Sequence, residues 1–145
     1  LARTAWVDFG LHSKPRAAGE ANSLNYIYSH ETGTTDDGSA MEPFIESSVF
    51  SIGDGEQFSF ISRLIPDIDI ASSDAATAVN YVLKSRNFPG ESLSTNSTSA
   101  VTSTTDQAFV RSRSRSSVLR VESSARDIQW TLGDLRLDIR PDGRR

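Results

Sequence analysis

The sequence predicts an all-β fold, such as an antiparallel sandwich, with long Ser/Thr-rich loops. Residues 135–140 read Leu-Arg-Leu-Asp-Ile-Arg, and this alternation indicates a strand with one buried face, because strand side chains point alternately to opposite faces. Other runs rich in β-branched and aromatic residues are separated by clusters of Gly, Asp, Asn and Pro, which favour turns. This pattern predicts about eight to ten strands.

The first two predicted strands lie near the N-terminus. Residues 3–9 alternate in polarity and are followed by Gly10 and Pro15, which end the run. Residues 24–30 are rich in aromatic and β-branched side chains and run into a dense turn cluster at 31–38. We therefore expect two strands, each followed by an exposed loop.

The runs 44–52 and 58–65 are predicted to form a hairpin. They flank the sequence Gly-Asp-Gly-Glu, whose glycines can adopt the positive φ that tight turns require. Pro66 cannot donate to a strand ladder, so it is expected at an edge or a bulge if the strand resumes through Ile68 and Ile70.

Residues 77–86 fit both a strand and a helix. Val79, Tyr81 and Leu83 would share one face of a strand, whereas a Ser73 cap favours a helix. We favour the strand because of the β-branched and aromatic content and the abrupt stop at 87–90, which reads Asn-Phe-Pro-Gly.

Residues 91–106 are almost all Ser, Thr and Asn, and they are predicted to form a long polar loop. Strands resume at 109–110, continue through 117–122 and 128–132, and finish at 135–140.

The length of 145 residues suits a single β-rich domain spanning 1–145. The chain opens on Leu1 in a strand-like run, so we expect it to be a fragment of a longer polypeptide. A net charge of −4 gives the chain no general attraction to nucleic acid.

No run reaches the roughly 18 apolar residues of a membrane helix, and no export signal is visible, so membrane insertion is not expected. The absence of cysteine excludes disulfides and thiolate metal sites.

Motifs for catalysis are incomplete. Residues 30–34 begin like a zinc-protease motif, but Thr34 stands where the second histidine ligand belongs. Neither a Gly-x-Ser-x-Gly elbow nor a phosphate-binding glycine loop is present in the sequence. Asp67 and Asp69 would lie about 6.6 Å apart on one strand face, a spacing that suits a cation or a pair of acid and base, although solvated surface is the more common outcome. We therefore predict no enzyme activity, no metal and no cofactor.

Arg111, Arg113 and Arg115 are the candidate functional residues. Apolar residues flank them on both sides, so we expect them to line one face of a continuous β ribbon, at intervals of about 6.6 Å. Such a row could pair with an acidic row on a neighbouring strand or subunit, face water, or meet DNA phosphates, and the last is the least favoured.

Six separate segments resemble the nozzle or hub family of short-tailed bacteriophages, often called DNA-stabilisation proteins, and they occur in the family's order. The segments are residues 3–6 (RTAW), 28–33 (YSHETG), 41–47 (MEPFIES), 52–55 (IGDG), 86–90 (RNFPG) and 136–145 (RLDIRPDGRR). Two positions depart from the family pattern: the family tends to show an Arg-x-Arg-Gly-Arg-Gln-like ribbon near residue 113, and Trp-Arg-Leu-Gly in place of Trp-Thr-Leu-Gly at 130–133.

The resemblance implies that the chain is the C-terminal portion of a longer β-rich tail protein, in a family that often has propeller-like sheets. It implies a structural virion protein of the phage tail, assembled in the bacterial cytoplasm, that helps to retain and pass the genome. It would join a homo-oligomeric ring of about six copies below the portal and adaptor, through which double-stranded DNA passes during ejection. Because the chain is acidic overall, we predict a neutral or acidic lumen, not one lined by the three arginines.

Two other functions compete with this one. In a carbohydrate-binding β-sandwich, Trp6, Tyr26, Tyr28 or Trp130 would stack on sugar rings, and exposure of these aromatic side chains would favour it. Glycan hydrolysis by a carboxylate pair such as Asp67 and Asp69 ranks third.

Overall fold

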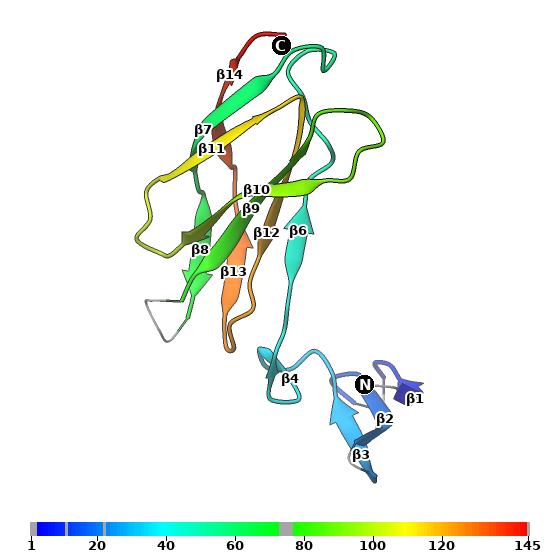
Figure 1. The fold of residues 1–145 in the computed structure, drawn as a ribbon. Helices are drawn as coiled ribbons and strands as arrows, with labels where there is room; N and C mark the ends of the chain where they lie inside the picture. Colours follow the sequence, from blue (N-terminus) through cyan, green and yellow to red (C-terminus); the bar gives the residue numbers. More distant parts are fainter. Residues whose placement is uncertain (1–2, 11, 22, 73–76, 145) are drawn as a thin grey trace. The chain divides into compact units, whose positions relative to one another are not determined.

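A computed structural model describes residues 3–10, 12–21, 23–72 and 77–144, which form fourteen β-strands and no helix (Figure 1). Every strand pairing in the described residues is antiparallel, and no sheet closes into a barrel. The prediction of an all-β antiparallel fold is therefore confirmed.

The chain divides into two compact units, residues 1–33 and 34–145, where the sequence predicted one domain. The first unit is a three-stranded sheet in which β2 (Arg16–Ala21) lies between β1 (Arg3–Val7) and β3 (Leu24–Ser29). The sequence did not predict β2, because its run of Arg, Ala, Gly and Glu has little of the β-branched and aromatic content that marks a strand.

The second unit contains two main sheets. One has the order β10-β9-β12-β6, and the other has the order β11-β7-β14. The strands of the first sheet are β6 (Phe44–Glu46), β9 (Val79–Arg86), β10 (Ser94–Val101) and β12 (Ser116–Glu122). Those of the second are β7 (Ser59–Ile65), β11 (Ala108–Ser114) and β14 (Arg136–Pro141). Two short pairs complete the unit: β4 (Thr35–Asp36) with β5 (Ser39–Ala40), and β8 (Ile68–Ala71) with β13 (Gln129–Leu132).

Both main sheets contribute to a single hydrophobic core, as in a β-sandwich. Ile61 and Leu64 enter it from β7, and Tyr81 and Leu83 enter it from β9. Val79–Arg86, within the run predicted at 77–86, therefore form a strand, while the competing Ser73 cap lies outside the described residues.

Six serines are also buried in this unit, at Ser59, Ser85, Ser112, Ser114, Ser117 and Ser123. The hydroxyls of Ser114 and Ser117 lie 3.0 Å apart, and Ser59 donates to the carbonyl of Ser114 at 2.9 Å. Hydrogen bonding offsets the cost of burying these hydroxyls. The interior can therefore form although the mean hydropathy of the chain is only −0.37.

Two sequence predictions are wrong in this unit. The polar loop predicted at 91–106 contains β10, which pairs with β9 from Val101 to Ser94. At the edge of a sheet a strand needs few apolar residues, so polarity alone did not exclude it. The predicted hairpin of 44–52 with 58–65 does not form either, because β6 pairs with β12, and β7 pairs with β11 and β14.

A long antiparallel ribbon joins the second sheet to the short pair β8-β13. The segment from β7 to β8 runs beside the segment from β13 to β14, with Ser59 opposite Pro141 at one end and Ala71 opposite Gln129 at the other. The ladder is interrupted at Pro66, where the sequence analysis expected an edge or a bulge. There the backbone N–H of Gly133 donates to the carbonyl of Asp67 at 2.8 Å.

Candidate functional site

The three candidate arginines do not all lie on one continuous ribbon. Arg111 and Arg113 are exposed on β11, where they alternate with the buried Ser112 and Ser114. Arg115 is only partly exposed and lies between β11 and β12, which belong to different sheets. The structure thus bears out the alternation for Arg111 and Arg113, whereas the chain changes sheet at Arg115.

Arg113 is held in place by an aspartate and an aromatic ring. Its Nε lies 2.6 Å from a carboxylate oxygen of Asp142, and its Nη2 donates to the Asp142 carbonyl at 3.0 Å. The guanidinium carbon lies 4.0 Å from the centre of the Phe58 ring, which is the geometry of a cation–π contact. The guanidinium carbon of Arg115 lies 5.0 Å from the centre of the same ring, and its Nη2 donates to the carbonyl of Arg144 at 3.3 Å.

The neighbouring strands add three more arginines to the outer side of this sheet. Arg63 on β7 lies opposite Asp138 and binds its carboxylate at 2.6 Å. Arg136 and Arg140 lie on β14, and the Arg140 guanidinium carbon is 4.7 Å from the centre of the Phe60 ring.

We call this surface the arginine face. It consists of Arg63, Arg111, Arg113, Arg136 and Arg140, with Asp138 and Asp142 as the acidic members, and it includes the Phe60 and Phe109 side chains. Five arginines against two aspartates leave an excess of three positive charges in a chain whose net charge is −4.

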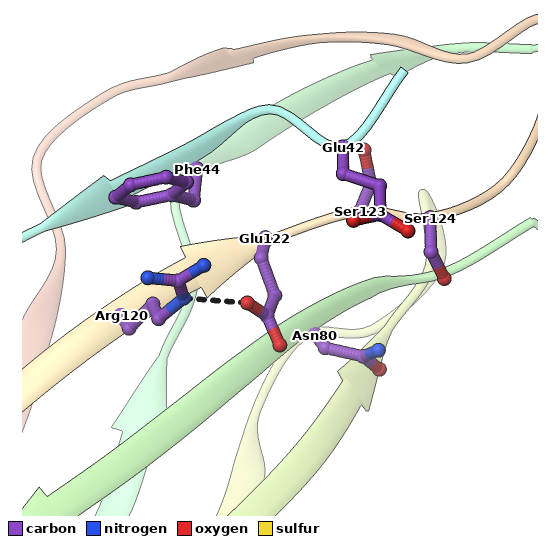
Figure 2. A pocket seen from close by; sticks show the side chains of 7 residues that line it. All are labelled: Glu42, Phe44, Asn80, Arg120, Glu122, Ser123 and Ser124. Carbon is purple, nitrogen blue, oxygen red and sulfur yellow. Dashed lines mark hydrogen bonds and ion pairs between the residues drawn. The ribbon is translucent and has the colours of Figure 1, made fainter. Parts of the chain in front are cut away.

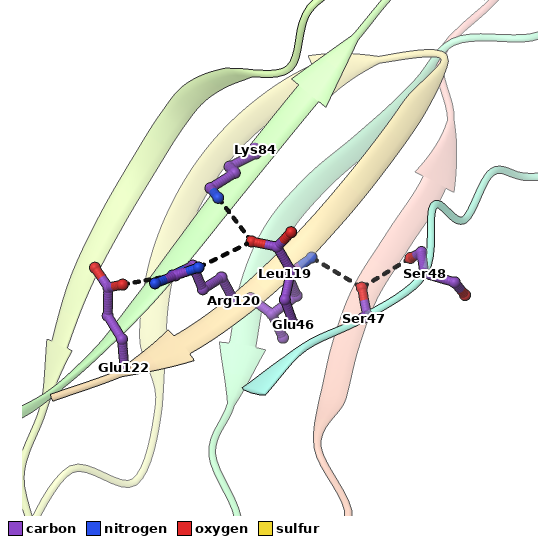
Figure 3. Close-up of polar contacts among 7 residues, drawn as sticks. All are labelled: Glu46, Ser47, Ser48, Lys84, Leu119, Arg120 and Glu122. Carbon is purple, nitrogen blue, oxygen red and sulfur yellow. Dashed lines mark hydrogen bonds and ion pairs between the residues drawn. The ribbon is translucent and has the colours of Figure 1, made fainter. Parts of the chain in front are cut away.

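A second polar cluster lies on the outer side of the four-stranded sheet (Figure 3). The Glu46 carboxylate lies 2.7 Å from Lys84 Nζ and 3.5 Å from Arg120 Nη1, and Arg120 Nε also donates to Glu122. The Phe44 ring supports the Arg120 guanidinium carbon at 3.7 Å. Each charge in this cluster therefore has an opposite charge beside it.

The cluster shifts two pKa values in the directions that its contacts require. The hydrogen bond from Lys84 lowers the pKa of Glu46 below 4.5. The hydrogen bond to Glu122 raises the pKa of Arg120 above its ordinary value. The ionised forms of both groups are thereby stabilised, which suits a structural contact between strands better than proton transfer near neutral pH.

An open hollow of about 250 Å³ lies at one end of this cluster (Figure 2). Its lining consists of Glu42, Phe44, Asn80, Arg120, Glu122, Ser123 and Ser124. Arg120 already bonds Glu122 there, and neither histidine of the chain belongs to the lining, so the hollow contains no serine activated by an imidazole.

Asp67 and Asp69 do not share a strand, contrary to the sequence prediction. Asp69 lies on β8, whereas Asp67 precedes that strand and accepts a hydrogen bond from the backbone N–H of Asp134 at 2.9 Å. Within the described residues, no three His, Cys, Asp or Glu side chains are placed to hold a metal ion. The same part of the chain has no helix that is long and apolar enough to span a membrane.

The two tryptophans occupy different environments. Trp6 is 52% exposed on the N-terminal sheet, and its ring centre lies 4.6 Å from that of His30. Trp130 is partly buried against the core of the second unit, and its Nε1 donates to Ser123 Oγ at 3.0 Å. Trp6 therefore belongs to an exposed surface, whereas Trp130 is a packing residue.

The N-terminal sheet exposes much of its aromatic and apolar surface. Tyr26 is 43% exposed and Ile27 is 76% exposed. The guanidinium carbon of Arg3 lies 3.7 Å from the centre of the Tyr28 ring, and its Nε lies 3.3 Å from His30 Nε2. Tyr26 and Tyr28 share one face of this sheet with Trp6, which lies opposite Ala17 as Tyr28 does, whereas Ile27 lies on the other face. The aromatic face could receive a flat apolar surface or a sugar ring.

No protein-family model matches the chain, and no curated protein matches its sequence significantly.

The alternation of Arg136, Asp138 and Arg140 was predicted from the sequence, but not their place in the same sheet as β11. That place depends on β7, which lies between β11 and β14 and pairs with both strands. The cluster around Glu46 was missed for the same reason, because Glu46, Lys84 and Arg120 come from three strands separated in sequence.

Proposed function

We propose that this chain is a structural virion protein of a bacteriophage short tail, a nozzle or hub component that contributes to an oligomeric DNA conduit. The observation that carries the proposal is the set of six ordered segments that resemble the family. The all-β fold is compatible with it, and two surfaces of the structure support a role in assembly: the arginine face and the exposed sheet of the N-terminal unit.

In this proposal the chain has no catalytic step. The polar side chains of its two main clusters are largely engaged in ion pairs and cation–π contacts, which favour fixed geometry over chemistry. Copies of the chain would form a ring of about six subunits that meets the portal, the adaptor and other tail proteins. The net charge of −4 would limit the retention of passing DNA by phosphate contacts.

Labelling of intact particles tests this proposal. An antibody against the purified chain, detected by immunogold electron microscopy on short-tailed phage particles produced with this gene, should mark the tail tip. Particles that carry no label, and in which mass spectrometry detects no peptide of the chain, would refute a virion role.

Carbohydrate binding is the second candidate, because Trp6 and Tyr26 are exposed on one small sheet. Aromatic side chains placed in this way can stack on sugar rings. Binding on a glycan array that is lost in a Trp6→Ala variant, and kept in a Phe88→Ala variant of the second unit, would favour this function. Phe88 is a suitable control because it is also exposed, at 63%.

A further inference from the structure

The charge of the second unit is separated between two surfaces. The arginine face carries an excess of three positive charges, so the rest of the chain must sum to −7. Two members of the face, Arg111 and Arg136, make no ion pair or hydrogen bond to any described residue. Arg140 contacts the Phe60 ring but has no carboxylate beside it among those residues. Three guanidinium groups are therefore free to bind an external anion.

The arginine face also has an apolar member. Phe109 lies on β11, two residues before Arg111, and 75% of its surface is exposed. A mixture of unpaired guanidinium groups and an exposed aromatic ring is typical of protein interfaces, where Arg and Phe are enriched.

An acidic surface, opposite in charge to the arginine face, lies elsewhere in the same unit. We call it the acidic turn; it consists of Asp36, Asp37, Glu42 and Asp127, with Arg126 beside them. Thr34 Oγ1 donates to Asp127 at 2.8 Å, and the N–H of Ser123 donates to the carbonyl of Pro43 at 3.3 Å, so residues 34–43 run along residues 123–127. All four acids are exposed, and the surface has an excess of three negative charges.

The two surfaces are far apart within the unit. Figure 1 shows β4, which carries Asp36, at one end of the second unit, and β14, which carries Arg140, towards the other. One copy therefore cannot satisfy its own arginine face with its own acidic turn.

We propose that the arginine face of one copy docks against the acidic turn of a second copy. This inference rests on the proposed function, because it identifies the surfaces through which the subunits of the conduit would meet. Guanidinium and carboxylate groups form short, directional and often bidentate hydrogen bonds, which fix the orientation of the partners. Since the two surfaces differ, the contact is heterologous and repeats from copy to copy, as a closed ring requires.

The charge distribution favours a second copy over DNA as the occupant. A duplex that approached the arginine face would also meet the field of the −7 remainder, which repels phosphates. The acidic turn of a second copy carries an excess of only three negative charges. The same field therefore repels it less than it repels a duplex, which carries about one negative charge per 1.7 Å of its axis. The inference also agrees with the prediction that the lumen is neutral or acidic.

A charge-swap experiment tests the inference. Arg111→Glu with Arg136→Glu reverses the face, and Asp36→Lys with Glu42→Lys reverses the turn. These positions avoid Asp37 and Asp127, whose φ values of 48° and 56° would strain most other side chains. In sedimentation velocity at low salt, the unaltered chain should self-associate, and each double variant should associate at least about tenfold more weakly. Mixing the two variants should restore a complex. The unaltered arginine face of one variant can then bind the unaltered acidic turn of the other.

Lys14→Glu with Arg16→Glu is the matched control for the reversed arginine face, because it changes the net charge of the chain by the same amount as Arg111→Glu with Arg136→Glu. Since the change lies on the N-terminal unit, it should leave association unchanged. Circular dichroism and thermal unfolding would verify that every variant folds. A monomeric unaltered chain, or a mixture of variants that stays dissociated, would overturn the inference. Binding of a short DNA duplex that the Arg111→Glu, Arg136→Glu variant loses, without self-association, would assign the face to nucleic acid instead.

The failures of the two proposals are distinguishable. Tail labelling without self-association would refute this contact and leave the virion role standing. Self-association through these surfaces without tail labelling would do the reverse.

Discussion

The Asp67 carboxylate occupies the space that a side chain at Gly133 would need. A Cβ placed on Gly133 would lie 2.5 Å from Asp67 Oδ2, and this same oxygen accepts the hydrogen bond from the Asp134 N–H. The contact lies at the interruption of the long ribbon, between β7 and β8 on one side and β13 and β14 on the other. It connects the two halves of that ribbon where the regular ladder is missing.

Replacing Gly133 with Ala should destabilise the second unit by about 1–3 kcal/mol, because the new methyl group displaces the carboxylate and leaves the Asp134 N–H without its partner. Urea denaturation followed by far-UV circular dichroism measures the loss. The Asp67→Ala variant supplies the control through a double-mutant cycle, since Gly133→Ala should cost much less once the carboxylate is absent. Equal costs in the two backgrounds would contradict this account.

Removing the hydroxyl of Tyr81 should leave stability unchanged or increase it by up to about 1 kcal/mol, because this buried group makes no hydrogen bond to the described residues. The Tyr81→Phe variant tests this in chemical denaturation, with Tyr81→Ala as the contrasting change that opens a cavity. A large loss of stability in Tyr81→Phe would show that the hydroxyl has a partner.

The same residue predicts a loss of stability in alkali. Burial raises the pKa of Tyr81 to about 12, and the negative charge of Asp67 adds to the shift. Because the folded pKa exceeds the ordinary value of 10.0, the contribution to stability is complete below pH 10.0 and is lost as the pH rises towards 12. Denaturation midpoints measured over this range should fall more steeply for the unaltered chain than for Tyr81→Phe.

Acid should weaken the contact between β6, β9 and β12. The hydrogen bond from Lys84 holds the pKa of Glu46 below 4.5, so the contribution of this carboxylate is present above that pH and is lost as the pH falls through the lowered value. Thermal unfolding between neutral and acidic pH should show a smaller acid-induced drop for Glu46→Gln than for the unaltered chain. Glu56→Gln is a useful control, since Glu56 is highly exposed and its nearest cation is 4.0 Å away.

The two tryptophans should differ in fluorescence quenching. In a Trp130→Phe variant the remaining Trp6 is exposed, and acrylamide should quench it strongly. In a Trp6→Phe variant the remaining Trp130, which is packed and hydrogen-bonded to Ser123, should be quenched less. Equal quenching would show that the N-terminal sheet buries Trp6 in solution, which would weaken the carbohydrate-binding alternative.

Alternation along the sequence predicted individual strands well. The runs predicted at 135–140 and 77–86 contain the strands Arg136–Pro141 and Val79–Arg86, because side chains of period two can place one face against the core whatever the partner strand is. In the C-terminal strand Leu137 packs against the core, whereas Ile139 is exposed. Ser94 to Val101 escaped prediction because β10 lies at the edge of its sheet and needs little apolar surface.

Pairing between strands could not be predicted in the same way. Residues 53–56 favour a tight turn, yet the strands on either side of them, β6 and β7, belong to different sheets. Residues 53–56 favour a hairpin locally. Which strands pair is determined instead by the packing of the whole unit, in which Ile61 and Leu64 share a core with Tyr81. The arginine face shows the same limit. Arg111 was predicted from the sequence, but its neighbours on β7 and β14 were not, because they depend on how the strands pair.

The alternation of serine and arginine along β11 also determines its alignment. If the strand slipped by one position, guanidinium groups would replace Ser112 and Ser114 inside the protein, where nothing could solvate them. A strand with so few apolar side chains gains little from correct placement, but it would lose a great deal from a wrong one. The register of this strand is thus determined mainly by the free-energy cost of burying arginine in the shifted alignment. This cost explains how so polar a segment can keep a single register.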